Sequence, residues 1–199
     1  MASRSAATAT VRPQSGLRQV AADYLELTKP KVQSLLIFTT VTTMYVAGDP
    51  PIDVVLLTCL GGYLSAGGAG AVNHFYDRDI DASMSRTAGR PVPSGRVAPA
   101  AALTYGLVLA ALAIVVLWIG VNPLAAALSF SGFVGYVLVY TVWLKRSTPQ
   151  NIVIGGAAGA VPPLVGWAAT TGSLSWTRCT CSPSSSTGPR RTSGRCRYS

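Results

Sequence analysis

The sequence predicts an all-α protein, a polytopic bundle of membrane-spanning helices. Its 199 residues are 49% hydrophobic and only 12% charged, whereas soluble domains carry roughly 25% charged residues. A helix of about 20 apolar residues is long enough to cross a bilayer. Five runs approach that length: 32–48, 54–72, 98–119, 123–144 and 152–171. A soluble protein with five buried core helices is the alternative, but the runs leave almost no polar faces for water.

Turn and helix-start signals separate these runs. Several runs begin at such signals: Pro-Pro at 50–51, Pro99, and the pair Asn122 and Pro123. The glycines of GGYLSAGGAGAV, residues 61–72, predict a face on which membrane helices pack closely. No strand precedes them, so a phosphate-binding loop is not favoured.

Lys and Arg alternate with the predicted spans. They occur in the N-terminal segment, the 73–97 loop and the 145–150 loop, whereas the connections at 49–53 and 120–122 have none. By the positive-inside rule, the N-terminus and the two basic loops lie on the cytoplasmic side. Topology thus accounts for the net charge of +9, and no extended basic and aromatic surface remains for nucleic acid.

The two ends of the chain differ in composition from the middle. Residues 1–22 are rich in Ser, Ala and Thr, which predicts a disordered cytoplasmic segment, with a transit peptide as the alternative. Residues 177–199 hold five Arg and three of the four cysteines, but no Leu, Ile, Val, Met, Ala or Phe. We interpret this stretch as an aberrant tail from a frameshift, with a genuine disordered tail as the alternative. The membrane domain is then residues 23–176.

Charge is concentrated in the stretch NHFYDRDIDASMSRTAGRPVPSGR, residues 73–96. Here Asn73, Asp77 and Asp81 recur every four residues, so on a helix they lie within about 80° of one another. The spacing predicts one row of an amide and two carboxylates at the mouth of the membrane region, with Asp79 pointing away. Ionisable groups at such depth are costly and are usually functional. A solvated loop with local ion pairs is the alternative.

The chemistry of this row favours a magnesium–diphosphate site. Its ligands are all oxygens, which Mg²⁺ prefers, commonly together with substrate phosphates. No His or Cys lies in the row, which argues against zinc or copper, and we interpret His74 as an ordinary polar loop residue. Arg86 and Arg90 are suited to contact phosphate oxygens, and Lys145 and Arg146 come from another loop on the same side.

Three ordered blocks of the sequence resemble one family of membrane enzymes. They are LTKPKVQSLLIFTTVTTM (27–44), DRDIDASMSRTAGRPVPSGR (77–96) and YTVWLKRSTPQNIVIGGAAGAVPPLVGWAATTGSLS (140–175). They are similar to the protoheme IX farnesyltransferases, or haem O synthases, of the UbiA-type membrane prenyltransferase superfamily. The resemblance covers about residues 23–176.

This resemblance implies a fold and a reaction. The family fold has nine transmembrane helices around a central cavity, with two aspartate-rich motifs that hold Mg²⁺ and diphosphate. The reaction transfers a farnesyl group from farnesyl diphosphate to a vinyl group of haem b, and water completes the product, haem O. The implied partners are farnesyl diphosphate, haem b, the lipid bilayer, and haem A synthase or oxidase assembly factors. The implied location is a bacterial cell (plasma) membrane rather than the mitochondrial inner membrane.

The motif match also implies two groups of site residues. The catalytic residues, which hold Mg²⁺ partly through the diphosphate, are Asn73, Asp77 and Asp81. The residues that contact the diphosphate are Lys145, Arg86, Arg90 and Lys31.

The sequence departs from the family pattern after the fifth predicted helix. There the 177–199 tail stands in place of the second aspartate motif and the last four helices, so we expect the chain as written to be truncated and inactive. Another UbiA-type prenyltransferase acting on an aromatic or quinone precursor is an alternative, although RTAGRPVPSGR and KRSTPQNIVIGG favour the haem enzyme. A membrane transporter with an acidic ion site and a structural or assembly role are further alternatives.

Overall fold

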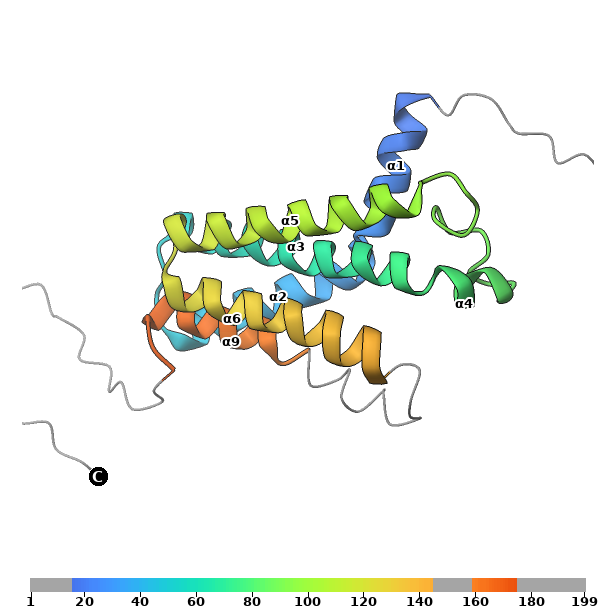
Figure 1. The fold of residues 1–199 in the computed structure, drawn as a ribbon. Coiled ribbons are helices and arrows are strands. Elements are labelled where there is room, and N and C mark those ends of the chain that lie inside the picture. The colour runs from blue at the N-terminus through green and yellow to red at the C-terminus, as the bar shows by residue number, and fades with distance from the viewer. Residues whose placement is uncertain (1–15, 145–158, 175–199) are drawn as a thin grey trace, which may run out of the picture.

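The computed structural model describes residues 16–144 and 159–174, and within them all regular structure is helical. The elements are α1 (Leu17–Leu27), α2 (Pro30–Ala47), α3 (Ile52–Tyr76), α4 (Arg78–Ser83), α5 (Pro99–Gly120), α6 (Pro123–Val134), η1 (Gly135–Leu144) and α9 (Val161–Thr171). Helices α3 and α5 run side by side, α2, α6 and α9 pack beneath them, and α1 crosses the end of this bundle (Figure 1). The predicted helical membrane bundle is therefore confirmed.

Three of the five predicted spans are long and apolar enough to cross a membrane. They are Ile52–Tyr76, Pro99–Gly120 and Pro123–Thr141. Helix α2 has 18 residues but includes four threonines and a lysine, which lower its hydropathy. Of the predicted span 152–171, the structure describes only the end, which contains α9. The number of spans therefore stays a prediction, and the two predicted tails lie outside the described residues, apart from 16–22.

Helix α2 satisfies its own polar side chains. Thr39 donates a hydrogen bond to the carbonyl three residues earlier, and Thr40, Thr42 and Thr43 donate to carbonyls four residues earlier, each at 2.8 Å. Within a bilayer no water is available to hydroxyl groups, so such local bonds allow threonine inside an apolar helix. Gln33 of the same helix differs, because its side-chain oxygen has no hydrogen-bond partner among the described residues.

The predicted glycine packing face is confirmed between α3 and α5. A Cβ atom on Gly68 would lie 2.6 Å from the Gly106 carbonyl oxygen, and one on Gly106 would lie 2.8 Å from the Gly68 carbonyl oxygen. The two backbones touch, so only glycine fits at either position. This contact fixes α5 against the half of α3 that leads into the charged stretch.

The predicted start signals also act as expected at α6. The Asn122 side chain accepts a hydrogen bond from the Ala125 amide at 2.7 Å, so it caps the helix, and Pro123 follows in the first turn. The same side chain donates to the Ala168 carbonyl at 2.9 Å and so joins α6 to α9. Beyond Val134 the helix continues with the wider π-helical geometry of η1.

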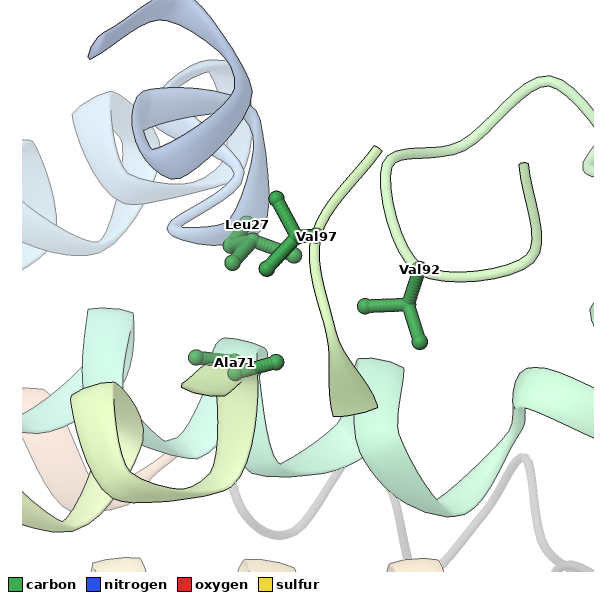
Figure 2. Packing of buried hydrophobic residues seen from close by; sticks show 5 residues of the cluster. Leu27, Ala71, Val92 and Val97 are labelled. Atoms are coloured by element: carbon green, nitrogen blue, oxygen red, sulfur yellow. The ribbon is translucent and has the colours of Figure 1, made fainter. Parts of the chain in front are cut away.

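A small core holds the charged loop against the bundle. Leu27, Ala71, Val92, Val97 and Ala102 form one buried cluster, in which Leu27 of α1 packs near Val97 of the loop (Figure 2). An ion pair reinforces this contact, because Arg96 Nε lies 3.0 Å from Asp23 Oδ1. The loop between α4 and α5 is thus attached to α1 on one side and to α3 on the other.

Candidate active site

The residues of the predicted row lie where α3 ends and α4 begins. Asp77 is the boundary residue, with φ −89° and ψ 1°, so the helix is interrupted there. Helical hydrogen bonds nevertheless continue across it: the Asp77 amide donates to the Asn73 carbonyl at 3.0 Å, and the Asp81 amide donates to the Asp77 carbonyl at 2.8 Å. The four-residue spacing therefore keeps its helical register through the break.

Burial separates the row from its neighbours. Asn73, Asp77 and Asp81 are 4%, 3% and 5% exposed, whereas Asp79 is exposed. A solvated loop does not bury two carboxylates, so the alternative of a solvated loop with local ion pairs is not supported. The interpretation of His74 was wrong, because His74 lies in the last turn of α3 and is buried.

Two short hydrogen bonds organise the row. Asn73 Nδ2 donates to Asp77 Oδ2 at 2.6 Å, and Arg90 Nη1 donates to Asp81 Oδ2 at 2.6 Å. The second bond is also an ion pair, which compensates the charge of a buried carboxylate. Thr87 Oγ1 donates to the Asp81 carbonyl at 2.9 Å, so the loop that supplies Arg90 is held at Asp81 twice.

The other predicted cations have different positions. Arg86 is exposed, and among the residues that the structure describes it forms no ion pair. Lys31 is exposed on the first turn of α2, and Lys145 lies outside the described residues. Of the three predicted cations within the described residues, Arg90 alone is brought to the row, and a contact of Arg86, Lys31 or Lys145 with diphosphate stays a prediction.

A largely apolar cavity of about 290 Å³ opens between α2, α3, α6, η1 and α9. Its walls include Val32, Leu36 and Ile37 of α2. Gly70 of α3 and Tyr136 of η1 also line it. Gly70 precedes Asn73 by three residues, so the cavity extends to within about one helical turn of the row. Such a hollow can hold a hydrocarbon chain whose polar end lies at the carboxylates.

Sequence reasoning missed Lys29, which lines this cavity. Lys29 has φ 54° and ψ 61°, a left-handed conformation that is uncommon for a residue other than glycine. It directly precedes Pro30, the first residue of α2, and this Lys-Pro pair was the available signal of an unusual backbone at the helix start. Gln33 and Tyr136 were also missed, because neither residue type in an apolar run points to a site.

The donor set of the row suits a hard cation that a ligand helps to bind. Within residues 16–144 and 159–174, no three His, Cys, Asp or Glu side chains gather closely enough to hold a metal ion by themselves. In proteins, Mg²⁺ is usually bound by one or two carboxylates from the protein together with phosphates from the substrate. The buried Asn73, Asp77 and Asp81 supply two carboxylates and one amide oxygen, which is enough for such a site.

Comparison with known proteins identifies the family of this chain. The model of the UbiA prenyltransferase family matches residues 35–182. The chain belongs to the UbiA prenyltransferase family. Curated relatives that are similar to this chain carry the name protoheme IX farnesyltransferase. The resemblance to that group, which the sequence blocks indicated, is thereby confirmed.

Three bacterial relatives illustrate the similarity. The protein from Chloroflexus aurantiacus is 58% identical over 85% of this UbiA chain and 29% of its own length. The protein from Symbiobacterium thermophilum is 55% identical over 85% of this chain and 57% of its own length. The protein from a Synechocystis strain is 50% identical over 83% of this chain and 53% of its own length. The chain thus spans between 29% and 57% of the length of these relatives. No solved structure matches it.

Proposed function

We propose that this chain contributes to the transfer of a farnesyl group from farnesyl diphosphate to a vinyl group of haem b, which gives haem O. The observation that carries the proposal is the buried row of Asn73, Asp77 and Asp81 beside an apolar cavity. Family membership and relatives named protoheme IX farnesyltransferase support it. Because the chain spans only part of those relatives, the activity is proposed for the protein as a whole.

The row is suited to bind a diphosphate through a cation. Asn73 orients the Asp77 carboxylate and Arg90 orients the Asp81 carboxylate, so both acids are held in place before a ligand arrives. Mg²⁺ bound between these carboxylates and the diphosphate would neutralise the charge of the leaving group. In this proposal Asn73, Asp77 and Asp81 are the metal and catalytic residues.

The remaining cations act on the diphosphate in this proposal. Lys145, Arg86 and Lys31 supply further positive charge from two loops and the start of α2, and Lys29 lines the cavity. Positive charge held in a site with a low dielectric constant stabilises developing negative charge better than solvated charge does.

The apolar cavity provides for the farnesyl chain and for the cation that forms when diphosphate departs. Its largely apolar walls disfavour bulk water, which would otherwise capture an allylic cation before the acceptor reacts. The bilayer supplies both lipophilic substrates. We further propose a cytoplasmic N-terminus in a bacterial cell membrane, with haem A synthase or oxidase assembly factors as neighbours.

The test uses the whole protein that contains residues 23–176, in lipid nanodiscs with farnesyl diphosphate, haem b and Mg²⁺, because the chain as written is expected to be inactive. Farnesylated haem is measured by chromatography with mass spectrometry, and Mg²⁺-dependent binding of farnesyl thiodiphosphate is measured by calorimetry. We expect Asp77→Ala and Asp81→Ala each to weaken binding by about tenfold or more, because each removes a charge that holds the metal. The exposed Asp79→Ala is the matched control and should bind as the wild type does.

Three results would contradict the proposal. Equal loss in all three variants would show that the buried row has no special role. Farnesylation of a phenolic acceptor in place of haem would identify another prenyltransferase of the family. Binding of a cation without any diphosphate dependence would favour an ion transporter.

A further inference from the structure

Gln33 of α2 has an unusual environment for a residue in the wall of an apolar cavity. Its side chain is 3% exposed and lines the cavity of about 290 Å³. The amide nitrogen Nε2 donates two hydrogen bonds, to the Thr28 carbonyl at 3.1 Å and to the Tyr63 carbonyl at 3.3 Å. Both hydrogens of the amide are therefore in use.

These two bonds also fix which way the amide faces. Rotating it by half a turn would place oxygen against two carbonyl oxygens, so only one orientation is compatible with Thr28 and Tyr63. The oxygen Oε1 is then directed away from both carbonyls, and it is buried without a hydrogen-bond partner among the described residues. A buried acceptor without a donor costs about 1–3 kcal/mol.

The chemistry of the proposed ligands narrows the choice of donor. A farnesyl chain carries no polar hydrogen, an ionised diphosphate offers acceptors only, and a porphyrin that holds iron has no N–H group. Each of them would leave Oε1 unsatisfied. Water is the small donor that the cavity can admit, since one water needs only about 10–15 Å³ of such volume.

We propose that the Gln33 side-chain oxygen holds a water molecule in the cavity, and that this water ends the transfer reaction. The water site follows from the geometry of Gln33 alone, whereas its role in the reaction rests on the proposed function. Gln33 is then a positioning residue, because it acts on substrate through the water.

The depth of Gln33 in the cavity suits this role. A Cβ atom on Gly67 would lie 3.3 Å from Gln33 Nε2, and Gly67 precedes Asn73 by six residues, or about 9 Å along α3. A diphosphate bound at the row would direct the reacting end of its chain into that interval. Water at Gln33 would therefore be set back from the row at which the diphosphate would bind.

The bonds of the reaction balance with this water. The C1–O bond of farnesyl diphosphate breaks, and the diphosphate keeps the electron pair. The vinyl π electrons form a new C–C bond to C1, which leaves the positive charge on the other vinyl carbon. The water oxygen donates a lone pair to that carbon, and its proton passes to the released diphosphate. Without the water, the same cation loses a proton and yields an alkene.

The test compares products from the whole protein that contains residues 23–176, in nanodiscs supplied with farnesyl diphosphate, haem b and Mg²⁺. Mass spectrometry separates the hydroxylated product from the alkene, which lacks the added water. We expect Gln33→Met, which removes the acceptor, to lower the ratio of hydroxylated product to alkene by about tenfold, the equivalent of one lost hydrogen bond. Gln33→Glu is not a suitable control, because it would place an oxygen against the Thr28 and Tyr63 carbonyl oxygens. Gln33→Asn keeps both an amide donor and an acceptor oxygen, so it should lower the ratio less than Gln33→Met does.

A second control separates the effect of losing the water site from the effect of changing any polar side chain in the cavity wall. Thr40 lines the same cavity, but its hydroxyl already donates to the Leu36 carbonyl at 2.8 Å, so Thr40→Val should leave the product ratio unchanged. A wild-type ratio in Gln33→Met would overturn the proposal, and so would an equal fall in Thr40→Val. A merely structural role of Gln33 would lower the total yield and leave the ratio as it is.

The failure of the proposed function is distinguishable from the failure of this inference. If the wild type farnesylates no haem, the proposed function is wrong, and an experimental structure that resolves water molecules then decides the water site. A water within hydrogen-bond distance of Gln33 Oε1 would support it, and a protein donor on that oxygen would overturn it. The same structure serves if Gln33→Met does not fold.

Discussion

The close contact of α3 and α5 allows a stability prediction with a matched control. In Gly68→Ala the new Cβ would lie 2.6 Å from the Gly106 carbonyl oxygen and 3.1 Å from the Ala110 amide nitrogen. Ordinary contact begins at 3.4 Å, so the shortfall is about 0.8 Å. Both obstacles are backbone atoms, so no side-chain rotation relieves them and the helices must separate.

The control is Gly62→Ala on the same helix, where nothing lies within 4 Å of the new Cβ. Both substitutions gain about 0.8–1 kcal/mol of helix propensity, so their difference isolates the steric cost. Overpacking of this kind costs about 1–3 kcal/mol. For a chain of this size that corresponds to a melting temperature about 2–12 °C lower in Gly68→Ala than in Gly62→Ala.

Thermal unfolding in detergent, followed by circular dichroism, measures this difference. Gly106→Ala should repeat the loss, because its Cβ would meet the Gly68 carbonyl oxygen at 2.8 Å. Equal melting temperatures for Gly68→Ala and Gly62→Ala would refute the conclusion that the two backbones touch. Because Gly68 precedes Asn73 by five residues, about 7.5 Å, we also expect weaker diphosphate binding in Gly68→Ala.

Two further predictions concern the loop and the topology. Arg90→Met removes a charged hydrogen bond to a buried carboxylate and should lower the free energy of unfolding by about 1.5–3 kcal/mol. Arg86 is exposed, so Arg86→Met should change the free energy of unfolding by less than about 0.5 kcal/mol. Equal effects in chemical denaturation would contradict the ion pair. Reporter fusions at Asp49 and Asn122 should report the outside of the membrane and a fusion at Ser85 the inside. An inside signal at Asn122 would refute the topology.

The row could be predicted from the sequence because its signal is local. Asn73, Asp77 and Asp81 share a four-residue spacing, and helical hydrogen bonds preserve that register even where the helix is interrupted. The glycine face between α3 and α5 was predictable for a similar reason, since small residues in an apolar run have few other uses in membranes.

The cavity residues could not be predicted in this way. Gln33 is placed by carbonyl groups at Thr28 and Tyr63, which belong to different elements and which no spacing in α2 reveals. Lys29 and Lys31 are two residues apart and of one type, yet only Lys29 lines the cavity, because a left-handed backbone turns the chain before α2. Tertiary contacts and backbone conformation decide such positions, and composition does not encode them.

The pairing of α3 with α5 has a consequence for biosynthesis. Residues 52–120 form a contiguous helical hairpin that contains the glycine contact, the carboxylate row and the arginine that braces it. Chains are synthesised from the N-terminus, so this hairpin is complete before any later helix has left the ribosome. The ion pair at Asp81 can then form early, and each later helix is added to a half-site that already exists. An insertion defect within 52–120 should therefore be more damaging than one in any later segment.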